Sequence, residues 1–304
     1  MDNKTICSIE TFDLESKPND MLVEVTNRCN YQCNFCTYSR MTHHFGDIDP
    51  IFLKRVLYEA FDIGVRKVGL YTIGEMFLCK DIAIHIKNAK DVGYEYIYAD
   101  TNGALAGRKN LEAVIIAGLD SIKFSINAGK RETYKKIHGQ DKFRTVLENL
   151  QACYELKQDL NPELKIMVSF VVTKENEDEI ELLRGMVEPY INQYMVHPIS
   201  VRHNSENDMR NTLEPKMGKH IQKIPCFMVF TRLHITFDGY LTACCQDFNY
   251  DLLLADLKKM PLKEAWISKN AIELRQMHIN KTVEGLLCNN CIKTTYQKYR
   301  ALKL

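Results

Sequence analysis

Short runs of apolar and β-branched residues alternate with longer amphipathic segments between residues 21 and 200. Short runs of this kind are typical of strands, whereas apolar residues recurring every three or four positions are typical of helices. The predicted strands cover residues 21–26, 66–73, 94–100, 121–127, 164–173 and 194–200. The predicted helices between them cover residues 50–63, 79–92, 107–118, 130–158 and 175–190.

This alternation indicates an α/β fold with a parallel sheet and helices on its outside. Six such strands are the number expected of a partial (β/α)6 barrel, although a flat doubly wound sheet would give the same pattern. In either arrangement ligands bind at the carboxyl ends of the strands. We expect this domain to occupy residues 1–200 and its site to lie in the loops that follow the strands.

The pattern changes in the last third of the chain. The segment RLHITFDGYLTAC predicts a β-hairpin that turns at Asp238 and Gly239, and residues 261–278 predict an amphipathic helix that begins at Pro261. We therefore expect a small C-terminal domain of a β-hairpin plus a helix over residues 226–304. Residues 201–225 would form a linker that borders the substrate pocket.

Composition and charge narrow the class of protein. The chain has 304 residues, of which 45% are hydrophobic and 26% charged, as in ordinary globular proteins. Forty basic and thirty-nine acidic residues leave a net charge of +1, so no overall field attracts nucleic acid or a membrane. No stretch reaches the roughly 18 apolar residues of a membrane span, and the opening residues do not resemble a secretory signal. We expect a cytoplasmic protein with reduced thiols.

Eleven cysteines are the one compositional excess, and three of them follow the first predicted strand with C-x3-C-x2-C spacing: Cys29, Cys33 and Cys36. Three thiolates hold three irons of a [4Fe-4S] cluster and leave the fourth iron open to a substrate or cofactor. Zinc is the alternative, but structural zinc takes four ligands, commonly in paired C-x2-C units. Disulfides are disfavoured in a reducing compartment. The isolated Cys7, Cys79 and Cys153 are expected to be small buried hydrophobes.

With this triad the chain resembles the radical S-adenosylmethionine (radical SAM) superfamily. The resemblance implies that the open iron binds the amino and carboxylate groups of S-adenosylmethionine. It also implies that one electron from a reducing partner such as flavodoxin or ferredoxin cleaves the sulfonium bond. The 5′-deoxyadenosyl radical then abstracts hydrogen from a small-molecule substrate.

The same resemblance implies cofactor-binding residues near the triad. Phe35 stands where the family places an aromatic residue against adenine. Gly74 and Glu75, in YTIGEMF, stand where relatives carry a GGEP-like motif that holds the methionine amino group. The match is partial, because Ile73 and Met76 depart from the motif. A glycine after a strand is also a common turn residue.

Three further residues follow the third and fourth strands. Ser125, Asn127 and Asn102 are implied to contact the carboxylate or ribose of the cofactor, Ser125 most directly. Each is also of a type that caps helices or forms turns. His138, in the charged segment that follows, is expected to be structural rather than catalytic.

The remaining cysteines resemble those of a twitch domain, a shortened SPASM extension that binds one auxiliary [4Fe-4S] cluster. The implied ligands are Cys226, Cys244, Cys288 and Cys291, with Cys245 as a substitute for Cys244. Four protein ligands leave no open iron, so this cluster would exchange electrons rather than bind substrate. A structural zinc site on the same thiolates is the alternative.

Within twitch proteins the chain resembles dehydrogenases that oxidise a secondary alcohol of the aminocyclitol 2-deoxy-scyllo-inosamine. They share its length, the C-x2-C tail and the CxxDFN phrase that here begins at Cys244. This implies a two-electron oxidation of a sugar-like hydroxyl, with the auxiliary cluster accepting an electron. Such a reaction needs a base, and the linker offers Arg202, His203, Asp208 and Arg210.

Two other functions remain open. Related enzymes crosslink or epimerise ribosomal peptides, usually with an N-terminal peptide-recognition domain, but only about 20 residues precede the first strand here. A non-catalytic metal-binding or electron-transfer module is the alternative outside enzymes.

Overall fold

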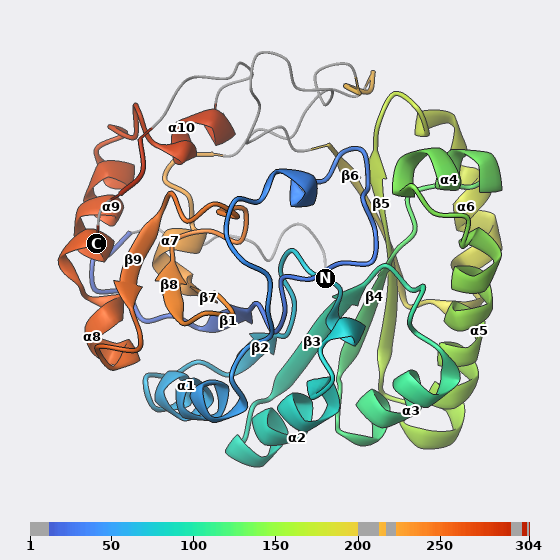
Figure 1. The fold of residues 1–304 in the computed structure, drawn as a ribbon, viewed down its shortest axis with the longest axis horizontal. Coiled ribbons are helices and arrows are strands. Elements are labelled where there is room, and N and C mark those ends of the chain that lie inside the picture. Colours follow the sequence, from blue (N-terminus) through green and yellow to red (C-terminus); the bar gives the residue numbers. More distant parts are fainter. Residues whose placement is uncertain (1–11, 200–212, 217–222, 293–299, 303) are drawn as a thin grey trace.

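The computed structural model describes residues 12–199, 213–216, 223–292, 300–302 and 304, and its centre is a curved sheet of nine strands (Figure 1). The first six strands in the sequence are parallel and lie side by side in sequence order. They are β1 (Asp20–Val23), β2 (Lys67–Gly69), β3 (Tyr96–Thr101), β4 (Ser121–Ser125), β5 (Lys165–Val172) and β6 (Gln193–Pro198). The predicted partial (β/α)6 barrel is confirmed.

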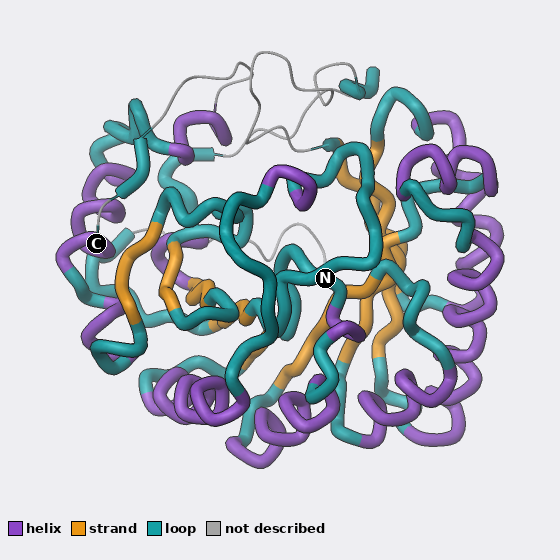
Figure 2. The backbone as a smooth tube through the Cα atoms, in the orientation of Figure 1, coloured by secondary structure: helices purple, strands orange, loops and turns teal. Residues whose placement is uncertain are grey.

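Six helices follow the outer face of these strands, and Figure 2 shows them as an arc around the sheet. They are α1 (Pro50–Asp62), α2 (Ile82–Val92), α3 (Arg108–Ile116), α4 (Arg131–His138), α5 (Phe143–Leu160) and α6 (Ile180–Val187). Among the described residues, no helix is both long and apolar enough to cross a membrane.

One helix prediction was wrong. The single helix expected over residues 130–158 is two helices, because Gly139 has a left-handed φ of 70° and ends α4. Its N–H still donates to the carbonyl of Lys135, which satisfies one of the free acceptors at the helix end. The break allows α4 and α5 to follow the curve of the sheet as separate units.

Local chemistry explains why α1 begins at residue 50. The Asp49 side chain accepts a hydrogen bond from the Phe52 N–H at 2.7 Å, and Pro50 takes the first helical position, where its missing N–H has no cost. Leu53, Val56 and Leu57 then form the buried stripe that faces the sheet.

The two faces of the sheet have different roles. Met21 and Val23 of β1 belong to the main core that packs against the outer helices. Leu22 points to the opposite, inner face. There a Cβ on Gly69 would lie 2.4 Å from Leu22 Cδ2 and 2.7 Å from Tyr98 Cε2, so these residues fill the interior at one level. A site inside the barrel must therefore lie above them, toward the carboxyl ends of the strands.

The C-terminal region continues the same sheet rather than forming a separate one. Strand β7 (Arg232–Ile235) pairs in parallel with β1, and β8 (Tyr240–Thr242) and β9 (Leu253–Asp256) follow it as antiparallel strands. The predicted hairpin at Asp238 and Gly239 is the β7–β8 turn. The tail is therefore joined to the barrel through backbone hydrogen bonds.

The described part of the tail also contains the helices α7 (Met228–Thr231), α8 (Leu262–Trp266), α9 (Lys269–Ile279) and α10 (Leu287–Ile292). The single helix predicted over residues 261–278 is α8 and α9. The chain leaves helical geometry at Ser268, whose hydroxyl caps α9 by accepting from the Ala271 N–H.

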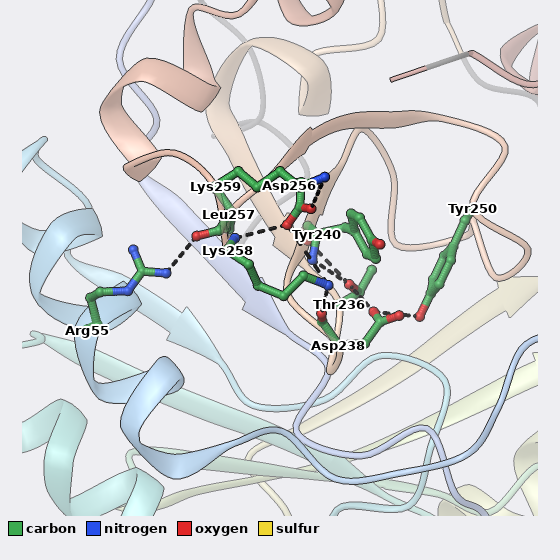
Figure 3. Close-up of polar contacts among 9 residues, drawn as sticks. All are labelled: Arg55, Thr236, Asp238, Tyr240, Tyr250, Asp256, Leu257, Lys258 and Lys259. Carbon is green, nitrogen blue, oxygen red and sulfur yellow. Dashed lines mark hydrogen bonds and ion pairs between the residues drawn. The ribbon is translucent and has the colours of Figure 1, made fainter.

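Polar contacts join the hairpin turn to the rest of the tail, and one contact joins the tail to helix α1 (Figure 3). The Asp238 carboxylate accepts from the Tyr250 hydroxyl at 2.9 Å, and the Asp238 carbonyl accepts from Lys258 Nζ at 2.8 Å. From α1, Arg55 Nη2 donates to the carbonyl of Leu257 at 2.7 Å. The barrel and the tail thus share hydrogen bonds on the outer side of the sheet as well.

A buried arginine connects the N-terminal segment with the tail helices. Arg275 is 1% exposed, and its guanidinium lies 3.8 Å above the ring of Trp266. It donates to the carbonyls of Val229, Leu14 and Trp266 at 2.9–3.0 Å. Burial lowers its pKa to about 10, so the guanidinium stays charged at neutral pH.

We expect Arg275→Met to lower the free energy of unfolding by about 2–4 kcal/mol, because three buried carbonyls lose their donor. Urea denaturation measures the change. Arg144→Met is the matched control: Arg144 is largely exposed and pairs only with Glu148 one turn away, so its loss should cost under about 0.5 kcal/mol. Equal losses in the two variants would contradict the role given to Arg275.

Candidate active site at the carboxyl ends of the strands

The loop that carries the three clustered cysteines leaves β1 and is closed at its base. In Figure 1 this blue loop arches across the open end of the curved sheet. Asn27 accepts from the Gly46 N–H and donates to the His44 carbonyl, both at 2.8 Å. The Thr26 hydroxyl donates to the Gly46 carbonyl at 3.0 Å. These contacts fix both ends of the loop and so position what it carries.

The cysteine triad is half-buried, and its chemistry fits a metal cluster. Burial raises the pKa of Cys29 to about 11, and the charges of Glu75 and Cys36 act in the same direction. Burial also raises the pKa of Cys33, together with the charges of Cys36 and Cys29. Three such neighbouring thiols lose their protons together only when a cationic centre binds among them.

His138 contacts this triad, which the sequence prediction of a purely structural role did not anticipate. Its Nδ1 lies 3.0 Å from Cys33 Sγ, and its Nε2 lies 2.7 Å from the carbonyl of Ile126. Because a carbonyl only accepts, Nε2 carries the proton. The sequence feature that could have pointed to His138 is its place at the end of the helix that follows the FSIN segment.

Gly74 allows the β2 loop to approach the cysteine loop. A Cβ at this position would lie 2.3 Å from the Thr26 carbonyl oxygen and 2.7 Å from that of Arg28. The neighbouring Glu75 N–H donates to the Arg28 carbonyl at 2.8 Å. This close approach of two backbones, rather than a turn, is what requires glycine here.

The Glu75 carboxylate joins the loops after β2 and β3. It accepts from the Thr101 hydroxyl and the Asn102 N–H, both at 2.7 Å, and from the Phe77 N–H at 3.2 Å. Glu75 is 2% exposed, and burial raises its pKa to about 7. The residue therefore organises the site from within, beside the cysteine loop.

Asn102 lies against the cysteine loop. Its Nδ2 donates to Asn30 Oδ1 at 2.8 Å and lies 4.0 Å from Cys29 Sγ. Phe35 is half-buried, with its ring 6.5 Å from that of His138. The structure thus brings Phe35, Asn102 and Glu75 to the neighbourhood of the triad.

The two candidates after β4 differ. Ser125 is half-buried, and its hydroxyl lies 3.2 Å from that of Ser169. Asn127 is buried and has a positive φ of 57°. Its side chain accepts from the Val171 N–H at 2.8 Å, and its carbonyl accepts from Asn176. These contacts give Asn127 a role in closing the ends of β4 and β5.

The cysteines of the tail surround a second pocket. Its lining includes Cys226 before the hairpin, Cys244 after it, and Cys288 and Cys291 on α10. Burial raises the pKa of Cys288, as do the charges of Cys291 and Cys226. In the described part of the chain, no three His, Cys, Asp or Glu side chains converge on the position of one single ion. The thiols therefore border a shared pocket rather than one point.

The adjacent Cys245 belongs to a different place. It lines a cavity with Glu24, Thr72 and His234, to which Cys244 also contributes. Burial raises the pKa of Asp100, an interior residue of β3, and the nearby Cys245 acts in the same direction. The structure therefore groups Cys244, but not Cys245, with the other three cysteines.

Some predictions lie outside the described residues: the candidate substrate residues Arg202, His203, Asp208 and Arg210, and also Cys7. Cys79 and Cys153 are buried, as predicted. Sequence reasoning missed Glu24, a buried acid on the inner face next to β7, and His278, which lines the second cysteine pocket. No sequence motif marks either residue.

Comparison with known proteins assigns both halves of the chain. A profile of the Radical SAM superfamily matches residues 23–186, and a profile of the SPASM iron-sulfur cluster-binding domain matches residues 226–292. The first profile covers the strands and helices around the cysteine triad. The second covers the hairpin and the second group of cysteines.

Curated relatives carry the name of one activity. A probable GTP 3′,8-cyclase of Saccharolobus solfataricus is 30% identical over 71% of this chain and 68% of its own length. A protein of the same name from Saccharolobus islandicus is 32% identical over 60% of this chain. The chain spans less than two thirds of that relative, 58% of its length.

Solved structures share the fold at lower identity. BtrN, crystallised with AdoMet and 2-DOIA, matches with a TM-score of 0.62 and 17% identity over 94% of this chain and 97% of BtrN. SuiB of Streptococcus suis, bound to S-adenosylmethionine, matches with a TM-score of 0.70 and 14% identity over 86% of this chain and 68% of SuiB. The predicted likeness to an aminocyclitol dehydrogenase is confirmed at the level of the fold. The chain belongs to the radical SAM superfamily: it is a radical SAM enzyme with a C-terminal SPASM-type domain, and it uses a SAM-binding [4Fe-4S] cluster, S-adenosylmethionine and an auxiliary iron-sulfur cluster.

Proposed function

We propose that this enzyme oxidises a secondary alcohol of a small sugar-like or aminocyclitol-like substrate by two electrons. The observation that carries the proposal is the pocket lined by Cys226, Cys244, Cys288 and Cys291. Four thiolates supply every ligand of a [4Fe-4S] cluster and leave no iron open to a substrate. A closed cluster beside the active site is suited to accept an electron.

The residues around the triad would hold the cofactor. When bound, S-adenosylmethionine and the triad's cluster supply a 5′-deoxyadenosyl radical that abstracts hydrogen from the substrate. Phe35, Asn102 and Ser125 are proposed to contact the cofactor. Glu75 fixes the Asn102 backbone and, through its own N–H, the cysteine loop. The approach of these loops, made possible by Gly74, sets the distance between cofactor and cysteines.

Oxidation of an alcohol also needs a group that takes the hydroxyl proton. Among the described acids of the barrel interior, Asp20 pairs with Arg232 and Asp100 pairs with Lys123. Such pairing favours the charged carboxylate and opposes proton uptake. Glu24, next above Leu22 on the inner face, has only neutral donors among its described contacts.

Glu24 is therefore the proposed proton acceptor. Its carboxylate accepts from the Thr72 hydroxyl at 3.1 Å and from the Phe237 N–H at 3.3 Å. Burial raises its pKa to about 7, near the value that suits a general base at neutral pH. It lines the same cavity as Cys244. Proton and electron would thus leave the substrate on the same side, toward the tail.

A second candidate, a reaction of GTP, is favoured by the 30% identity to a probable GTP 3′,8-cyclase. Among the described residues, the interior cations do not favour it. A triphosphate needs unpaired cations, whereas Arg232 and Lys123 are each paired with a carboxylate among the described residues. The alcohol oxidation is therefore preferred.

One anaerobic experiment separates the two. The reconstituted protein is incubated with S-adenosylmethionine, reductant and either GTP or a panel of aminocyclitols and amino sugars that includes 2-deoxy-scyllo-inosamine. We expect 5′-deoxyadenosine together with a ketone from the panel. A cyclised product from GTP would support the second candidate. No 5′-deoxyadenosine from either, with both clusters intact, would reject both candidates.

Metal content tests the cysteine assignments. We expect about eight irons per chain, falling to about four when Cys29, Cys33 and Cys36 are replaced by Ala, because each [4Fe-4S] cluster holds four irons. Iron and zinc are measured by plasma emission spectroscopy. Four irons and one zinc in the unaltered protein would show that the tail cysteines bind a structural zinc ion instead.

The adjacent cysteines provide the matched control for the tail. Cys244→Ala should lower the iron of the auxiliary cluster, whereas Cys245→Ala should leave it unchanged, because Cys245 lies outside the lining of the four-cysteine pocket. Equal losses would contradict the separation of the pair.

Glu75→Gln should weaken S-adenosylmethionine binding by about tenfold and lower stability by about 1–3 kcal/mol. An amide places an N–H against one of the donors that now point at the carboxylate. Equilibrium dialysis and urea denaturation measure the two effects. Glu95→Gln, on the surface before β3, is the control and should change neither quantity. Unchanged S-adenosylmethionine binding in the Glu75 variant would exclude a role of Glu75 in cofactor binding.

Glu24→Gln keeps the shape of the side chain but cannot take a proton. We expect the ketone formed per 5′-deoxyadenosine to fall by about 100-fold, while iron content and 5′-deoxyadenosine formation are retained. Liquid chromatography with mass spectrometry measures both products. Thr72→Val, which removes a donor to Glu24 and no proton acceptor, should keep the ratio within about threefold. A ketone yield from Glu24→Gln equal to that of the unaltered enzyme would exclude the proposed role.

A further inference from the structure

His278 is a buried side chain in the pocket of the four tail cysteines. The proposed reaction assigns no role to this side chain. It lies in the last turn of α9 and is 2% exposed. The rest of the described lining includes the apolar side chains of Met228, Val229 and Ala243. A polar ring in such surroundings needs partners for both of its nitrogens.

One nitrogen has a partner that fixes the tautomer. The backbone N–H of Cys226 donates to His278 Nδ1 at 3.3 Å, so this nitrogen is an acceptor and carries no proton. With Nδ1 unprotonated, the ring is the neutral imidazole. A neutral imidazole has one proton, and it must therefore lie on Nε2.

The other nitrogen is a donor without an acceptor. Nε2 is buried and has no hydrogen-bond partner among the described residues. A buried donor without an acceptor is unfavourable, and native proteins rarely tolerate one. The pocket that His278 lines is the one whose thiolates would carry the auxiliary cluster. The sulfur atoms of that cluster would be the acceptors that the described lining does not provide.

We propose that His278 donates its Nε2–H to a sulfur atom of the auxiliary cluster and acts as a positioning residue rather than a ligand. Its Nδ1 is occupied by the Cys226 N–H, and four thiolates already complete the cluster. Hydrogen bonds to cluster sulfurs stabilise the reduced form, which carries more negative charge, and so raise the reduction potential. His278 would thus make this cluster a better electron acceptor, whatever the substrate.

Two variants separate the donor from the structural contact. In His278→Asn, the side-chain oxygen stands near the place of Nδ1 and can still accept from the Cys226 N–H, but nothing replaces Nε2–H. In His278→Gln, the amide N–H reaches toward the place of Nε2, while the Cys226 contact is lost. The whole chain is reconstituted with both clusters, and each potential is measured by redox titration monitored by electron paramagnetic resonance.

We expect His278→Asn to shift the auxiliary cluster to a more negative potential, with iron content unchanged and the potential of the triad's cluster unmoved. His278→Gln should retain a potential close to that of the unaltered protein. Electron–nuclear double resonance after exchange into D2O should detect an exchangeable proton near the auxiliary cluster, and His278→Asn should lose it.

An unchanged potential in His278→Asn would overturn the proposal. So would an equal shift in both variants, since that result assigns His278 only the contact with Cys226. These readouts do not depend on turnover. Failure of the alcohol oxidation would therefore leave the His278 result standing, and failure here would leave the oxidation intact.

Discussion

The parallel pairing of β7 with β1 is the constraint on which the rest of this enzyme depends. It joins Leu22 to His234 and Val23 to Ile235 in register, so the tail enters the molecule as a continuation of the barrel sheet. The loop with the first three cysteines leaves the same end of β1. The hairpin that leads to Cys244 begins at the corresponding end of β7. Backbone hydrogen bonds thus hold both groups of cysteines in one frame.

That pairing also creates the buried polar layer between the two halves. Glu24 follows β1 and accepts from the backbone of Phe237, which follows β7. Burying a charged carboxylate is unfavourable, and this cost raises the pKa of Glu24 to about 7. The buried Glu75 carboxylate accepts three hydrogen bonds from neighbouring loops, which offset part of the cost of its burial. Among the described residues, Glu24 and Glu75 are thus both buried with neutral donors around them.

Much of this arrangement could be predicted from the sequence, for reasons that are local. Short runs of apolar and β-branched residues located all six barrel strands, because a buried strand is a local segment of a few such residues. The spacing of Cys29, Cys33 and Cys36 indicated an iron-sulfur site because one short loop carries all three ligands. The same locality explains the failures: Gly139 divides a helix pattern that otherwise continues, and the cap at Ser268 divides another.

The sequence by itself determined the two groups of cysteines, the superfamily resemblance and the alternation of strands and helices. Only the tertiary structure decided which of two adjacent cysteines faces the others, since the directions of Cys244 and Cys245 depend on how the chain leaves β8. It also decided that Glu24 has no cation beside it among the described residues, and that one nitrogen of His278 has no partner among them. These properties arise from residues that lie far apart in the sequence, such as Cys226 and His278, and no local pattern records them.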